Sequence, residues 1–303
     1  ALAYIASGCS QPLLMTLLKE AKIADPSCQL YMLFYYLLPS AFILPILLAN
    51  QQSWPKRSTI YKASGIALWD ISSTSLNYTG ASLSGPTIFA IIYSSVTIWT
   101  AVFSQIFLGR TMSVWQWANV VVVFGGLALT AKDSVNLGED VLKGSTYIFL
   151  GSAMHGLTYV MSEAVMKGEH KLSVLQNNFV QGSVAASVFL VWQIFYTIPH
   201  FNEHIWYPMQ QAGTTVWYAC ILFGAFGVAN IVHSITFFHT LLHFPGGATS
   251  AGVMKGLQAV FVFVLTNLLY CNKIGGTEMC FSDSKFVSLI TVLGGVLGYG
   301  YAT

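Results

Sequence analysis

The sequence predicts an all-α integral membrane protein, and three observations support this. Of its 303 residues, 55% are apolar and only 8% are charged, whereas soluble domains carry about 25% charged residues. Apolar windows of about 20 residues, long enough to cross a bilayer as a helix, recur throughout the chain. The chain holds 26 glycines, and its apolar windows lack the alternation of barrel strands, so packed helices are favoured.

Charged residues, proline and glycine divide the chain into ten predicted transmembrane helices. The connections are short, the longest being 199–213 and 272–284, so we expect no soluble domain between spans. No stretch resembles a cleavable signal peptide, and because Ala1 opens inside an apolar run we expect flanking residues outside this numbering. The predicted spans are 1–18, 29–49, 60–79, 85–108, 112–131, 143–166, 173–197, 214–238, 247–270 and 285–302.

The chain predicts a 5+5 inverted repeat within one membrane domain. Val-Phe-Gly-Gly-Leu at 123–127 and Val-Leu-Gly-Gly-Val at 292–296 give the fifth and tenth spans similar patterns. A break at 132–142 separates residues 1–132 from 143–303, with five spans in each part. An odd number of spans inserts the second part into the membrane upside down, which is typical of alternating-access transporters.

Two charged side chains stand inside predicted spans. Lys255 is the only charge in 247–270. Because an ammonium near the bilayer centre costs roughly 2.5–3.5 kcal/mol, it favours contact with a cavity, a substrate or an anionic partner; snorkelling is the alternative. Asp70 in the third span has two interpretations: a gate if it pairs with Lys255, or a proton carrier if it is unpaired.

The remaining ionisable candidates are less distinctive. Glu163 lies near the end of its span, where a carboxylate can reach the interface; we interpret it as a surface anchor and keep it as a candidate gating group. His155, His233 and His239 could titrate near neutrality, although a lone histidine on an apolar helix is more often a packing residue. We keep His233 as a candidate substrate contact. No spacing indicates a metal site.

The predicted repeat also assigns a second wall to the cavity. A shift of 161 residues brings Ser94 onto Lys255, so Tyr93, Ser94 and Thr97 would face Lys255 by pseudo-symmetry. The alternative is that the serine and threonine side chains pack helices together or bond to their own backbone carbonyls.

The stretch 85–131 resembles the fourth and fifth helices of the EamA-like drug/metabolite transporter superfamily. The resemblance is carried by Phe-Leu-Gly-Arg-Thr-Met-Ser-Val-Trp-Gln-Trp at 107–117 and by Val-Val-Val-Val-Phe-Gly-Gly-Leu-Ala-Leu at 120–129. Val-Met-Lys-Gly around Lys255 resembles the ninth-helix lysine motif of nucleotide-sugar transporters in solute carrier family 35. Gln-Asn-Asn, containing Asn177 and Asn178, resembles the asparagine pair that begins their seventh helix. The resemblance implies that Lys255, Asn177 and Asn178 contact substrate.

One departure from that family concerns charge. Its sialic-acid nucleotide transporters place a second lysine in the fourth helix shortly after a tyrosine. The matching region, 93–97, reads Tyr-Ser-Ser-Val-Thr and holds no lysine. A nucleotide-sugar would therefore meet one cation instead of two.

These observations favour a secondary transporter that works by alternating access, as an antiporter of an anionic or zwitterionic metabolite, with a nucleotide-sugar among the candidates. A proton-coupled exporter of cationic or neutral solutes is the alternative, and a non-transporting receptor or scaffold is a third class. No catalytic motif is present, so we expect neither an enzyme nor a cofactor. The expected partners are a small-molecule substrate and the lipid bilayer, with a homodimer left open. No basic tract suggests nucleic acid.

Loop charges and cysteines predict the orientation. Basic loop residues divide six against six between the two sides, but eight acidic ones face away from the termini and one lies beside them. Cys271 and Cys280 flank the loop between the last two spans, and a disulfide there would need an oxidising compartment; two free thiols are the alternative. We expect cytosolic termini in a eukaryotic endomembrane (Golgi, endoplasmic reticulum, vacuole or lysosome) or in the plasma membrane.

Overall fold

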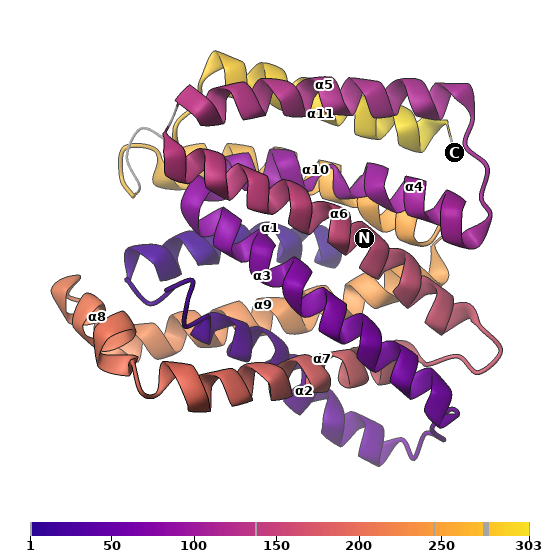
Figure 1. The fold of residues 1–303 in the computed structure, drawn as a ribbon, viewed down its shortest axis with the longest axis horizontal. Coiled ribbons are helices and arrows are strands. Elements are labelled where there is room, and N and C mark those ends of the chain that lie inside the picture. The colour runs from indigo at the N-terminus through magenta and orange to yellow at the C-terminus, as the bar shows by residue number, and fades with distance from the viewer. Residues whose placement is uncertain (1, 137, 245, 275–278, 303) are drawn as a thin grey trace.

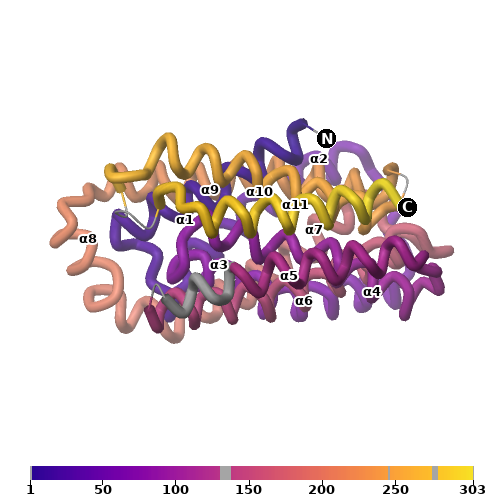
Figure 2. Tube along the Cα trace, turned by 90° about the horizontal axis from the view of Figure 1, so that it is seen from above, coloured from indigo at the N-terminus to yellow at the C-terminus, as the bar shows by residue number. Residues whose placement is uncertain are grey.

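The computed structural model describes residues 2–136, 138–244, 246–274 and 279–302, and every regular element in them is helical. The helices lie along one axis of the bundle, with both ends of the chain toward the same end (Figures 1 and 2). Their bounds are α1 Leu2–Glu20, α2 Leu30–Ala49, α3 Arg57–Tyr93, α4 Val96–Leu108, α5 Val114–Asn136, α6 Glu139–Lys167, α7 Val174–Trp192, η1 Gln193–Thr197, η2 Asn202–Trp206, α8 Tyr207–Gln211, α9 Val216–His243, α10 Ala248–Tyr270 and α11 Asp283–Tyr301.

Four of the described helical segments are long and apolar enough to cross a membrane. They are Leu30–Ala49, Val174–Thr197, Val216–His243 and Ala248–Tyr270, and the bent pair α3 and α4 makes a fifth if it counts as one span. The other long helices carry more polar residues; α6, for example, holds the buried Ser152 and Glu163. Polar faces directed into the bundle lower mean hydropathy without shortening a helix. The ten-span count therefore stays a prediction.

The chain reverses direction at Gly85, within α3. Gly85 has φ 81° and ψ 166°, left-handed values that glycine tolerates, and Pro86 follows it. Before this point α3 runs antiparallel to α6, since Gly80 meets Gly144 while Trp69 donates to the Met154 carbonyl at 3.1 Å. After it α4 runs parallel to α6, with Trp99 against Gly156 and Arg110 against Glu163. The break agrees with the predicted boundary between the third and fourth spans.

The helices pair across the two halves of the chain. Helix α1 of the first half packs against α9 and α10 of the second half. Helix α6 of the second half packs against α3 and α4 of the first. The pairs α2 with α7 and α5 with α11 form the two outer layers in Figure 1. The Gly-Gly pairs allow α5 and α11 to approach each other closely, because a Cβ on Gly126 would lie 3.0 Å from the Val292 backbone nitrogen.

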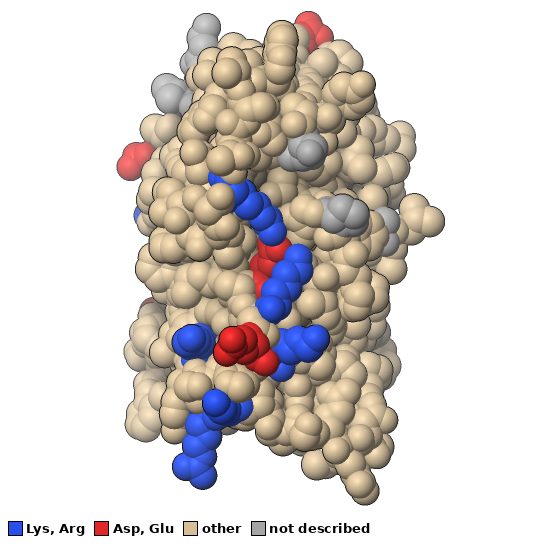
Figure 3. All heavy atoms as spheres, turned by 90° about the vertical axis from the view of Figure 1, so that its right-hand side faces the viewer, with Lys and Arg blue, Asp and Glu red and all other residues tan. Residues whose placement is uncertain are grey.

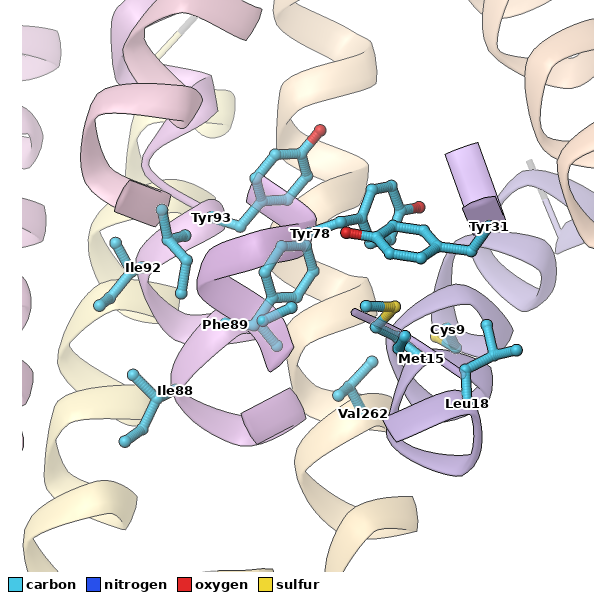
Figure 4. Close-up of a cluster of buried hydrophobic side chains, with 14 of the residues drawn as sticks. Cys9, Met15, Leu18, Tyr31, Tyr78, Ile88, Phe89, Ile92, Tyr93 and Val262 are labelled. Atoms are coloured by element: carbon cyan, nitrogen blue, oxygen red, sulfur yellow. The ribbon is translucent and has the colours of Figure 1, made fainter. Parts of the chain in front are cut away.

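An aromatic cluster forms the core beside the bundle centre (Figure 4). Tyr31 and Phe226 are fully buried and meet edge to face at 6.3 Å, and Tyr78 contacts both. Phe89 stacks on Tyr93 with ring centroids 5.0 Å apart. This cluster joins α2, α3 and α9 next to the cavity described below.

The predicted connection 199–213 is not a loop. It contains η2 and α8, which follow η1 and form a helical hairpin that projects at the end of the bundle opposite the chain termini (Figure 1). Pro208 fits this helix because it occupies one of the first two positions of α8, where no intrahelical N–H bond is needed.

Candidate substrate cavity

A cavity of about 90 Å³ lies at the centre of the bundle, between α1, α2, α3, α6, α7, α9 and α10. Aromatic rings and carboxamides make up much of its wall. Typical drug-sized pockets measure roughly 300–1,000 Å³, so this conformation has room for a small metabolite only. The carboxamides in its wall are Gln11, Asn77, Asn178, Gln181, Asn230 and Gln258.

Lys255 occupies one wall, on α10. Its Nζ lies 3.0 Å from Nε2 of His233 and 5.2 Å from the ring centroids of both Tyr4 and Tyr93. An ammonium can only donate, so His233 Nε2 accepts, and its Nδ1–H then donates to Ser7 Oγ at 3.2 Å. The π faces of two tyrosines stabilise a cation at this position. Lys255 is 6% exposed.

Asp70, on α3, contributes a carboxyl group to the wall of the same cavity. Its Oδ2 accepts hydrogen bonds from Tyr36 at 2.8 Å and from Thr74 at 3.4 Å. Its Oδ1 lies 3.4 Å from Nε2 of His155 and accepts no hydrogen bond from the described residues. Nδ1 of His155 in turn lies 3.1 Å from the Tyr93 hydroxyl. One carboxylate oxygen is therefore available to a ligand.

Lys255 and Asp70 line the same cavity without an ion pair between them among the described residues. The paired arrangement considered from the sequence is not the one observed. Tyr93 links the two positions instead, because its ring faces Lys255 and its hydroxyl faces His155. The cavity therefore presents one basic and one acidic side chain to whatever occupies it.

The second wall expected from pseudo-symmetry is only partly present. Tyr93 lines the cavity, but Ser94 and Thr97 are not among its lining residues. Ser94 donates to the carbonyl of Ile91 at 2.6 Å, and Thr97 packs against Gly252, where a Cβ would lie 2.8 Å from the Thr97 Cα. The expectation that these two side chains face Lys255 is thus wrong. The turn at residues 94–95 interrupts the helix and rotates the following residues.

The two asparagines at the start of α7 differ in position. Asn178 lines the cavity and donates to Ser234 at 2.9 Å. Asn177 lies behind the wall, where its Oδ1 accepts from Gln181 at 3.0 Å and its Nδ2 is buried without a hydrogen-bond acceptor in the described part of the chain. Only Asn178 is placed to contact a ligand directly in this conformation.

Glu163 is not a surface anchor. Its side chain is only 2% exposed, and its Oε1 accepts from Arg110 at 2.6 Å and from Lys167 at 2.8 Å. Its Oε2 accepts the backbone N–H of Ala248, the first residue of α10, at 2.9 Å. A Cβ at Gly247 would clash with this carboxylate. Glu163 therefore joins the ends of α4, α6 and α10.

This network belongs to the end of the molecule where the chain termini lie. Figure 3 shows that face, on which basic and acidic side chains gather near its middle while other residues surround them. Arg110 also donates to the Gly246 carbonyl at 3.2 Å, which adds a second link across the network. The sequence alone could not predict this network, because α4, α6 and α10 are far apart along the chain.

At the other end of the bundle, Cys271 and Cys280 form a disulfide with their Cα atoms 4.6 Å apart. It closes the loop between α10 and α11. Cys9, Cys28 and Cys220 carry free thiols.

Several cavity residues escaped the sequence analysis. His155 was considered a packing residue, yet it connects Asp70 with Tyr93. Gln11 donates to Asn230 at 3.0 Å, and Gln258 donates to the Tyr4 carbonyl at 2.9 Å. Carboxamides inside apolar helices are themselves an indication of a polar interior, and this pattern could have identified them.

The fold and the cavity together define a class, a helical membrane protein with a charged, carboxamide-lined cavity at its centre. Residues 15–132 match the EamA-like transporter family. This match covers 118 of the 303 residues and, with the curated relatives in solute carrier family 35, it agrees with the resemblance that the sequence indicated.

Solute carrier family 35 member F6 of Homo sapiens and of Pongo abelii is 27% identical over 134 residues, which is 41% of this chain and 36% of those proteins. The Mus musculus protein of the same name is 25% identical over 123 residues, 38% of this chain and 33% of its own. The match thus spans about a third of these curated relatives. A solved protein crystal structure has a similar fold over 99% of both chains, with 13% identity and a TM-score of 0.55.

Proposed function

We propose that the protein is a secondary transporter that exchanges small zwitterionic metabolites of the amino-acid type across a membrane. The observation that carries this proposal is the pair of unbridged charges, Lys255 and Asp70, on the wall of one cavity. A carboxylate on the ligand would reach Lys255, and an ammonium would reach the Oδ1 of Asp70. The aromatic rings of the cavity wall suit a compact apolar side chain on the ligand.

The transport mechanism proposed is alternating access by a 5+5 inverted repeat, with halves 1–132 and 143–303. The helix packing supports it. Exchanging α1 with α6, α2 with α7, α3 with α9 and α4 with α10 turns the contacts of α1 with α9, α1 with α10 and α2 with α9 into those of α6 with α3, α6 with α4 and α7 with α3, which are all present. The correspondence is partial, because the packing of α3 against α10 has no counterpart of similar extent between α9 and α4 among the described residues. The cavity lies between the halves, where such transporters hold their substrates.

The Glu163 network is the proposed gate at the termini end. It ties α4, α6 and α10 together through two ion pairs and a backbone hydrogen bond. Opening the cavity toward that end requires these contacts to separate. The side chains of Arg110 and Lys167 are 39% and 41% exposed. Water can therefore hydrate these two cations when they separate from Glu163 as the gate opens.

Two of the other candidates have less support. A nucleotide-sugar would need more room than about 90 Å³, and the cavity offers it one lysine. A proton-coupled exporter of cationic or neutral solutes remains the second candidate. The observation that favours it is the Asp70 Oδ1 beside His155, which has no hydrogen-bond partner in the described part of the chain. For orientation we propose cytosolic termini, because the disulfide lies at the opposite end, in an endomembrane or plasma membrane compartment.

A thermal-shift screen of the purified protein tests this proposal. The panel holds neutral amino acids, the matched carboxylic acids without the amino group, the matched amines, nucleotide-sugars and organic cations. We expect the zwitterions to stabilise the wild type and to drive counterflow in proteoliposomes. Stabilisation by nucleotide-sugars alone, or by cations alone, would overturn it. Lys171→Met, which removes an exposed lysine that does not line the cavity, serves as the control variant.

A further inference from the structure

Three side chains of metal-ligating type meet outside the cavity, at the end of the bundle that carries the disulfide. Asp25 and Cys28 belong to the loop between α1 and α2, and His204 belongs to η2 of the helical hairpin. One ligand atom from each residue lies within 4.8 Å of the other two. In Figure 1 the hairpin projects beside this loop, so the cluster joins two segments that are distant in sequence.

The ligand atoms are held in position by neighbouring contacts. The Oδ1 of Asp25 accepts the backbone N–H groups of Ser27 at 2.8 Å and of Cys28 at 2.9 Å. Its Oδ2 is left to face Nδ1 of His204 at 3.3 Å. The loop is fixed to the hairpin as well, because Gln193 and Thr197 both donate to the Cys28 carbonyl, at 3.0 and 3.2 Å.

The donor set matches zinc. Zinc binds thiolate at about 2.3 Å and imidazole or carboxylate at about 2.0–2.2 Å, which separates tetrahedral ligand atoms by roughly 3.3–3.7 Å. The distance from Asp25 Oδ2 to His204 Nδ1 already has this value, and the thiol needs a shift of at most about 1.5 Å. A soft sulfur with an imidazole and a carboxylate excludes calcium and magnesium, which prefer oxygen ligands alone.

We propose that Asp25, Cys28 and His204 bind one zinc ion, with water as the fourth ligand. The thiol of Cys28 is fully buried, whereas the Asp25 and His204 side chains are 23% and 27% exposed, so the ion has a route from solvent. The bound ion cross-links the loop between α1 and α2 to the helical hairpin after α7. This site is separate from the substrate cavity and does not depend on what the cavity transports.

Two π-helical segments, η1 and η2, carry residues of this cluster. A π turn places side chains at positions that a regular α-helix would not, and such turns are frequent at functional sites. η2 carries His204 and η1 carries Thr197, so both segments contribute to the cluster.

Cobalt(II), which replaces zinc in tetrahedral sites and is coloured, is the probe for the test. The full chain is purified without a polyhistidine tag, stripped with chelator, and titrated with cobalt and then zinc. We expect one equivalent of cobalt, a thiolate-to-cobalt charge-transfer absorption, and loss of the colour when zinc is added. Zinc should also raise the unfolding temperature.

The variants separate this site from chance binding. Cys28→Ser should abolish the charge-transfer band, and His204→Ala should weaken cobalt binding by about 10–100-fold or more. Cys220→Ser and His243→Ala, which remove an exposed thiol and an exposed imidazole elsewhere, should leave both unchanged. If Cys28→Ser does not fold, the His204 variant decides. A spectrum without a thiolate band, or equal binding by wild type and the His204 variant, would overturn the proposal.

Discussion

Lys255 and Asp70 face the same cavity, but their surroundings differ. Two hydroxyl groups already satisfy one oxygen of Asp70. Among the described residues, the ammonium of Lys255 contacts an imidazole nitrogen and two tyrosine π faces. A cation deep in a membrane protein costs roughly 2.5–3.5 kcal/mol, and a cation–π contact returns about 0.5–2 kcal/mol. The lysine therefore gains more from a ligand of opposite charge than the aspartate does.

The largest effect is expected from Lys255→Met, which keeps the length of the side chain and removes its charge. Loss of a charge-assisted hydrogen bond worth about 1.5–3 kcal/mol raises the Kd for a bound carboxylate by roughly 10–100-fold. The unfolding temperature without ligand should not fall, because a costly buried charge is removed. Calorimetric titration and thermal unfolding measure the two quantities. Lys171→Met is the control; an unchanged Kd would show that Lys255 is structural.

Asp70→Asn is expected to have the next largest effect, and it distinguishes the two transport classes. In the exchange mechanism, the variant binds zwitterions about tenfold more weakly, since one charged contact is lost, and its counterflow does not depend on an imposed pH gradient. In a proton-coupled mechanism the wild type depends on that gradient and the variant does not. Proteoliposome counterflow with and without a gradient decides, and an unchanged rate and affinity under both conditions would remove Asp70 from either role.

Tyr93 connects the two positions, and two variants separate its two contacts. Tyr93→Leu removes both the ring beside Lys255 and the hydroxyl, and the loss of the ring alone should weaken carboxylate binding by about 0.5–2 kcal/mol. Tyr93→Phe keeps the ring and removes only the hydroxyl that faces His155, so its effect on affinity should be smaller, about 0.5–1.5 kcal/mol. Titration of both variants with the same ligand checks this order. Equal losses in the two variants would mean that the hydroxyl, and not the ring, matters to the ligand.

The smallest effect is expected from Ser94→Ala. Its hydroxyl bonds to the backbone carbonyl of Ile91 and faces no ligand, so affinity should stay within about 0.5 kcal/mol of the wild type. A loss of binding as large as that of Tyr93→Leu would restore the pseudo-symmetric wall that this structure does not contain.

Sequence predicted those features that depend on local chemistry. A boundary between the spans 60–79 and 85–108 was predicted from charged residues, proline and glycine, and Gly85 and Pro86 form the break there. Lys255 and Asp70 stood out because charges inside apolar helices are expensive. The surroundings of Glu163 could not be predicted, since Arg110 and Ala248 approach it only in the folded bundle.

The sequence also could not predict which face of its helix Thr97 would occupy. A regular helix would place Thr97 on the same face as Tyr93, one turn away, but the turn at residues 94–95 separates their faces. The hairpin at 199–213 was missed for a related reason, because π-helical turns have no sequence period of their own.

The most direct test of two charges acting on one ligand is a binding series with matched probes. Phenylalanine, phenylpropionate and phenethylamine are titrated into wild type, Lys255→Met and Asp70→Asn. We predict that the wild type binds the zwitterion most tightly, that Lys255→Met binds phenylalanine no better than phenethylamine, and that Asp70→Asn binds it no better than phenylpropionate. Equal affinity of the wild type for all three probes, or the same order of affinities in all three proteins, would contradict a cavity that reads both charges.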